Sequence, residues 1–156
     1  MMENPDVFFV LENKSTTSET KTVRIDIPDF TKKIEDEANK MKPIDTPPFK
    51  IAGKKMAVSV QPYEARENSR GIGVYLVNLT EDEKLTATFT MIVCSRELTV
   101  GPCKSEIDPD TNMGYPCLLT HEVYKKWAKE NGDILKLEVK LTLHFSDNQS
   151  SWAIKG

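Results

Sequence analysis

The sequence lacks a long hydrophobic run. Its longest uninterrupted apolar stretch covers residues 7–11, far fewer than the roughly 20 residues that a transmembrane helix needs. The six residues before it carry acidic instead of basic side chains, so the start of the chain does not resemble a secretory signal. With 156 residues, 38% of them hydrophobic and 29% charged, the composition predicts one soluble globular domain. We expect this domain to act in the cytoplasm or the nucleus, with no membrane contact.

The sequence also lacks an excess of basic residues. Lys and Arg total 21 against 24 Asp and Glu, which gives a net charge of -3 at pH 7. Proteins that bind nucleic acid usually concentrate basic side chains in a patch or stripe. We therefore expect no nucleic acid as a partner.

Cysteine and histidine are scarce. Cys94, Cys103 and Cys117 form neither a Cys-x-x-Cys pair nor an even set, which favours free thiols in a reducing compartment over disulfides or a thiolate metal site. His121 begins a predicted helix and His144 lies on a predicted strand, so the sequence does not pair them. Nucleophile-elbow, Walker A, HExxH and GxGxxG motifs are missing. We expect no enzymatic activity, no metal and no cofactor.

One pattern points toward a secreted protein instead. Asn13, Asn78 and Asn148 each begin an Asn-x-Ser/Thr acceptor motif for glycosylation. Motifs this short also arise by chance in a chain rich in threonine. We therefore keep the intracellular assignment.

What the sequence does contain is alternation of apolar and polar residues, the pattern of a strand with one buried face. Four segments show it: residues 23–27, 56–61, 85–94 and 135–145. We expect the first to end at Pro28 and the second at Pro62, because proline cannot donate to a sheet ladder. Residues 73–79 are apolar on both faces, which indicates a strand whose outer side is covered or functional. Weaker strands are predicted at residues 7–11, 49–51 and 98–100.

Two helical segments interrupt the strands. Apolar residues recur at helical spacing from Phe30 to Met41, and we expect Asp29 to cap the start of this helix. A second helix is predicted after Thr120 and before Gly132.

About eight strands with helices only in connections predict an all-β fold, an antiparallel eight-stranded β-sandwich with two short helical connections. Residues 1–22 are then an N-terminal extension with the first strand, residues 23–145 the core of the same domain, and residues 146–156 a flexible tail.

Six short motifs follow one another along the chain: Pro-Pro-Phe at 47–49, Lys-Met-Ala-Val-Ser-Val-Gln-Pro at 55–62, Gly-Val-Tyr-Leu at 73–76, Leu-Thr-Ala-Thr-Phe at 85–89, Met-Gly-Tyr at 113–115 and Ile-Leu-Lys-Leu-Glu-Val at 134–139. In order and spacing they resemble the MATH domain, also called the TRAF-like or meprin-and-TRAF-homology domain. The likeness runs from about residue 7 to residue 145 and is closest to the speckle-type branch, whose members carry a BTB domain. The resemblance implies an eight-stranded antiparallel sandwich, the fold that the alternation also predicts.

Members of this family hold short peptide segments of partner proteins in a shallow groove across one sheet. Some of them are substrate adaptors for cullin-type ubiquitin ligases. The resemblance implies six peptide-binding positions in this chain: Tyr75, Phe89, Ser105, Asn112, Met113 and Tyr115. Ser105 stands where an aromatic residue is usual, and Asn112 belongs to a pair that replaces two charged residues. The resemblance thus implies a peptide-binding module whose ligand preference differs from that of its relatives.

The residues themselves bear on two of these positions. Tyr75 falls on the opposite face of its strand from Val74 and Leu76, which favours a surface position. Phe89 is in phase with the apolar face of its own strand, so core packing and groove lining both stay open for it.

Two other classes of function also stay open. One is a structural or assembly domain without a peptide groove, whose aromatic residues are core or subunit contacts. The other is an enzyme with a site that no motif reveals. Because the chain shows neither a heptad pattern nor a BTB segment, we expect a monomer in isolation.

Overall fold

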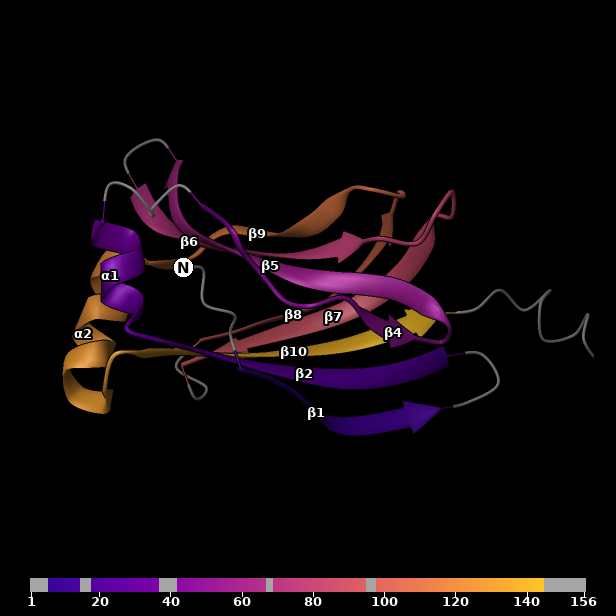
Figure 1. Ribbon diagram of the computed structural model, residues 1–156, viewed down its shortest axis with the longest axis horizontal. Coiled ribbons are helices and arrows are strands. Elements are labelled where there is room, and N and C mark those ends of the chain that lie inside the picture. The colour runs from indigo at the N-terminus through magenta and orange to yellow at the C-terminus, as the bar shows by residue number, and fades with distance from the viewer. Residues whose placement is uncertain (1–5, 15–17, 37–41, 67–68, 95–97, 145–156) are drawn as a thin grey trace, which may run out of the picture.

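The structure is a computed structural model, and it describes residues 6–14, 18–36, 42–66, 69–94 and 98–144. Within these ranges the chain forms two antiparallel sheets, and two helices lie together at one end of them (Figure 1). The prediction of an all-β fold of antiparallel strands with two helical connections is confirmed.

The ten strands of the described residues divide evenly between the sheets. Sheet A has the order β1 (Asp6–Lys14), β2 (Ser18–Pro28), β10 (Ile134–His144), β7 (Leu85–Val93) and β8 (Leu98–Ile107). Sheet B has the order β3 (Ile44–Asp45), β5 (Lys54–Arg66), β6 (Ser69–Asn78) and β9 (Asn112–Thr120), and β4 (Phe49–Ile51) also pairs with β5. The helices are α1 (Phe30–Glu35) and α2 (His121–Asn131).

Alternating side chains of the two sheets form one core. On β10, Leu137, Val139 and Leu141 are buried, and the residues between them are partly or fully exposed. On β6, Val74 and Leu76 are buried in the same way. Each such side chain contributes about 1.5–3 kcal/mol when it leaves water, so the alternation decides which face of each strand turns inward.

The strand boundaries agree with the prediction where alternation is strongest and differ elsewhere. Pro28 ends β2 as predicted, but Pro62 lies inside β5, which continues to Arg66 through a register shift between Gln61 and Glu64. Strands β3 and β9 were not predicted. They explain why ten strands replace the expected eight.

The boundary placed between residues 22 and 23 falls inside β2. The predicted tail, residues 146–156, lies outside the described residues.

Helix α2 forms as predicted. The side chain of Thr120 caps it, because its Oγ1 accepts a hydrogen bond from the backbone N–H of Val123 at 3.2 Å. Gly132 follows its last turn. Among the described residues, no helix has both the length and the apolar character needed to cross a membrane.

Helix α1 is shorter than predicted and is capped by a different residue. The expected cap, Asp29, has a left-handed backbone with φ of 53° and makes no capping hydrogen bond with its side chain. Asp133, just before β10, takes this role: its Oδ1 accepts from the backbone N–H of Thr31 at 3.0 Å and from the Thr31 hydroxyl at 2.9 Å. The helix ends at Glu35, and residues 37–41 of the predicted segment lie outside the described residues.

Asn78 at the end of β6 is a buried structural residue and not an accessible glycosylation site. Its side chain is 0% exposed and donates to the carbonyls of Glu83 and Ile107 at 2.8 and 2.9 Å. Its Oδ1 accepts from the N–H of Thr80 at 2.9 Å. An oligosaccharyltransferase cannot reach this side chain in the folded domain.

Candidate functional site

Strands β8 and β9 each lie at the edge of a sheet. β8 is the last strand of sheet A and β9 the last strand of sheet B, and they follow each other in sequence. We refer to residues 112–115 of β9, with the β8 side chains that face them across the sheets, as the β9 edge. Among the described residues, no further strand pairs with the outer side of β8 or β9, so the sandwich is open along this side.

Met113 and Tyr115 of β9 point toward the interior of the sandwich. In the β6–β9 register Met113 is opposite Leu76 and Tyr115 is opposite Val74, and both partners are core residues. Met113 and Tyr115 pack against the core but stay partly exposed, because no strand covers them on the outer side of β9 within the described residues.

Phe89 lies beneath Tyr115. It is 1% exposed, and its ring meets the Tyr115 ring edge-on, with centroids 5.8 Å apart and planes at 64°. Of the two alternatives left open for Phe89, core packing is therefore the one observed. Its contribution to the β9 edge is to support Tyr115 from below.

β8 supplies the opposite side of the β9 edge. Cys103 is paired with Phe89 and Ser105 with Ala87, so both side chains face the interior. Burial raises the pKa of Tyr115 above its ordinary value, and its interaction with the Cys103 thiol, including a hydrogen bond, adds to the shift. Tyr115 thus connects the two sheets at their open side.

The side chains of two predicted positions, Tyr75 and Asn112, point away from the interior. Tyr75 is on the outer face of sheet B, where its hydroxyl donates to Glu64 Oε2 at 2.6 Å. Asn112 is exposed and pairs with Val77, which is in phase with Tyr75 and so on the same outer face. The structure therefore turns the side chains of Phe89, Ser105, Met113 and Tyr115 toward the interior between the sheets, and those of Tyr75 and Asn112 toward the outer face of sheet B.

The outer face carries a hydrogen-bonded cluster around Glu64. Besides the Tyr75 hydroxyl, the carboxylate accepts from the backbone N–H of Cys117 at 3.1 Å, through Oε1. Cys117 has φ of 50° and lies beside the register shift of the β6–β9 pairing. This cluster ties the irregular parts of β5 and β9 together.

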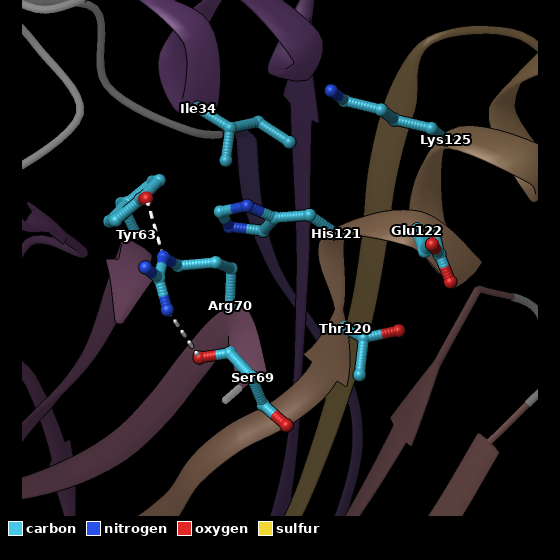
Figure 2. A pocket seen from close by; sticks show the side chains of 8 residues that line it. All are labelled: Ile34, Tyr63, Ser69, Arg70, Thr120, His121, Glu122 and Lys125. Carbon is cyan, nitrogen blue, oxygen red and sulfur yellow. Dashed lines mark hydrogen bonds between the residues drawn. The ribbon is translucent and has the colours of Figure 1, made fainter. Parts of the chain in front are cut away.

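A second candidate site is a pocket of about 470 Å³ near the start of α2 (Figure 2). Its walls come from α1, β5, β6 and the junction of β9 with α2. The lining residues are Ile34, Tyr63, Ser69, Arg70, Thr120, His121, Glu122 and Lys125. No motif in the sequence predicts this pocket, because its residues come from five elements: α1, β5, β6, β9 and α2.

Arg70 and Lys125 are the cations of the pocket. Arg70 Nε donates to the Tyr63 hydroxyl at 2.9 Å, and Nη1 donates to the carbonyl of Ser69 at 3.4 Å (Figure 2). Lys125 Nζ forms an ion pair with Glu35 Oε2 at 2.9 Å. Both cations are exposed to solvent.

The His121 ring forms part of the pocket wall and points from the start of α2 toward Tyr63, with ring centroids 5.0 Å apart (Figure 2). Its Nε2 donates to the carbonyl of Pro62 at 2.8 Å, since a carbonyl can only accept. Burial is the main cause that lowers the His121 pKa, and the charges of Lys125 and Arg70 add to it, while carbonyl hydrogen bonds oppose it. The ring is therefore neutral at pH 7.

Neither site is explained by a known relative. No family model matches the chain, and no curated protein matches it at a significant level. Among the described residues, no group of three or more His, Cys, Asp or Glu side chains could hold a metal ion. Function is therefore inferred from the chemistry of the two sites.

Proposed function

We propose that this domain is a protein-interaction module that binds a short extended peptide segment of a partner protein along the β9 edge. The observation that carries the proposal is the placement of Met113 and Tyr115. They are partly exposed apolar side chains at an edge strand, above the buried ring of Phe89.

The chemistry of an edge strand suits such a ligand. An edge strand leaves every second set of backbone N–H and C=O groups without a strand partner, and an extended peptide can pair with them. Alternate side chains of the added strand then face the same way as Met113 and Tyr115. We expect a peptide with apolar residues at alternate positions.

The length of the regular edge limits the paired segment. Pro116 has no N–H to donate, and the β6–β9 register shifts beyond Tyr115. The regular part therefore covers residues 112–115, enough for roughly four peptide residues at about 3.4 Å each. The Cys103 and Ser105 side chains of β8, which also face the interior, offer the peptide further contact area beside this short backbone ladder.

Other edges fit a peptide less well. β1 has nine residues, but its register with β2 shifts between Phe9 and Leu11. β3 has only two residues. β8 is interrupted at Gly101, whose φ is 109°, and at Pro102, where its register with β7 shifts. An irregular edge resists strand addition.

The resemblance to MATH domains supports the same function and extends it. Two antiparallel sheets with helical connections agree with the sandwich of that family. Because some members select substrates for ubiquitin ligases, we propose that the partner peptide belongs to a protein destined for ubiquitination in the cytoplasm or the nucleus. The β9 edge, and not Tyr75, is the surface offered for it.

The test is a selection of 12-residue peptides from a displayed random library against the folded domain, followed by amide NMR mapping of one enriched synthetic peptide. We expect the largest shifts at the amides of residues 112–115. Met113→Ala should lower the affinity of the domain for that peptide by about tenfold or more. Val77→Ala, on the outer face of the neighbouring strand, is the matched control and should bind like the parent. Shifts confined to the face around Tyr75 and Val77, or equal loss from both variants, would refute the β9 edge as the binding surface.

A further inference from the structure

We propose that the pocket beside the start of α2 binds a small aromatic anion, meaning a planar ring that carries a phosphate or carboxylate group. This ligand site is separate from the β9 edge and does not depend on peptide binding. The charges of the pocket, its walls and the exposed Lys125–Glu35 ion pair support this assignment.

The charges of the pocket favour an anion. Arg70 uses Nε and Nη1 for the contacts with Tyr63 and Ser69, which leaves other N–H groups of its planar guanidinium for a ligand. Such a fork matches the oxygens of a carboxylate or phosphate. The acidic side chain of the lining, Glu122, projects away from the His121 ring and from Arg70 (Figure 2).

The walls of the pocket favour a ring. Tyr63 and His121 present two aromatic side chains, and Ile34, which is 3% exposed, supplies an apolar surface. Planar ligands stack on such rings at little cost in conformational freedom. Because His121 is neutral at pH 7 and donates Nε2–H to Pro62, it contributes a surface and not a charge.

Lys125 is a second cation that a ligand can recruit. Its ion pair with Glu35 joins side chains that are 46% and 57% exposed, and exposed pairs of this kind contribute little to stability. An anion in the pocket can therefore compete with Glu35 for the ammonium group. Removal of the Glu35 charge should strengthen the site, an effect that a purely structural Lys125–Glu35 pair would not produce.

The experiment is an NMR and calorimetric titration of the full chain with phenyl phosphate, benzoate and inorganic phosphate. We expect saturable shifts at the pocket residues with phenyl phosphate or benzoate, and binding of inorganic phosphate weaker by about tenfold because it lacks the ring. Arg70→Gln should lower the affinity for both aromatic anions by about tenfold or more. Arg24→Gln, on the outer face of sheet A where Arg24 lies near Glu138, is the matched control.

Glu35→Gln gives an opposite and independent readout. We expect it to raise the affinity for phenyl phosphate or benzoate by roughly twofold to fivefold. Glu130→Gln, at the exposed end of α2, should leave the affinity unchanged. The two aromatic anions distinguish phosphate from carboxylate as the preferred group. The proposal is overturned if neither aromatic anion saturates, if Arg70→Gln binds like the parent, if inorganic phosphate binds as tightly as the aromatic anions, or if Glu35→Gln weakens binding.

Discussion

Asp133 should be the residue whose loss most directly uncouples the helical end of the domain from the sheets. Its Oδ1 accepts from the N–H and hydroxyl of Thr31 on α1 and from the hydroxyl of Tyr124 on α2 at 2.7 Å. Tyr124 is 0% exposed, and burial together with Asp133 raises its pKa far above the ordinary value. One carboxylate thus satisfies three donors from two helices.

The expected cost of Asp133→Ala follows from these contacts. A hydrogen bond to a charged group contributes about 1.5–3 kcal/mol, and loss of a helix cap costs about 1 kcal/mol. Because Asp133 is itself partly exposed, water can serve the Thr31 donors in its place, but it cannot reach the Tyr124 hydroxyl. We therefore expect a loss of about 3 kcal/mol for Asp133→Ala, and about 1 kcal/mol for Asp133→Asn, which keeps an acceptor.

Urea unfolding at pH 7 measures both variants. Asp45→Ala, at the exposed position of β3, is the control and should change stability by less than about 0.5 kcal/mol. A double-mutant cycle with Tyr124→Phe should give a coupling energy of about 1 kcal/mol. A loss below about 1 kcal/mol for Asp133→Ala, or no coupling to Tyr124, would refute the role of Asp133 as a shared acceptor.

Four further predictions concern single side chains. Gly114→Ala should cost about 1–3 kcal/mol in urea unfolding, because a Cβ there would meet the backbone oxygen of Val74; parent-like stability would contradict the close approach. Asn78→Ala should lower stability by about 2–4 kcal/mol, since the part-buried carbonyl of Glu83 and the buried carbonyl of Ile107 lose their donor; parent-like stability in urea unfolding would contradict this. Burial lowers the His121 pKa from 6.5, so below pH 6.5 the unfolded chain binds a proton that the folded chain does not, and stability should fall from pH 7 to pH 5.5 more steeply in the parent than in His121→Asn. Tyr75→Phe should lower the free energy of unfolding by about 0.5–1.5 kcal/mol and leave the affinity for a selected peptide unchanged. A loss of affinity would show that Tyr75 belongs to the binding surface.

Local pattern was enough to predict most of the strands. β7 and β10 alternate without interruption, so their predicted ends lie within one residue of the observed ones. The same phase placed Phe89 with the core residues of β7. Alternation is a property of neighbouring residues, and it can therefore be recognised without knowledge of the partner strand.

Features that depend on distant partners were not predictable. The run Gly114-Tyr115-Pro116 is typical of a turn, yet Gly114 is paired with Tyr75 of β6 and Pro116 continues the same strand. Asp29 looked like the cap of α1, but the acceptor is Asp133, 102 residues away from Thr31. These groups meet only when the chain folds, so residue spacing does not predict their contacts.

The candidate sites show the same division. The apolar character of Met113 and Tyr115 was evident from the sequence, but their separation from Tyr75 follows from the β6–β9 register. The pocket combines residues of five elements, and some of them, such as Tyr63 and Lys125, are far apart in sequence. A site of this kind has no motif by which to find it.

Strand β9 connects the two candidate sites, and the Glu64 cluster lies between them. The strand carries Tyr115 near one end, and Thr120 at its other end caps α2 beside the pocket. Between them, Glu64 on β5 binds the N–H of Cys117 at 3.1 Å, and its other oxygen binds the Tyr75 hydroxyl at 2.6 Å. These contacts hold the middle of β9 against β5 and β6, between the proposed peptide-binding edge and the pocket.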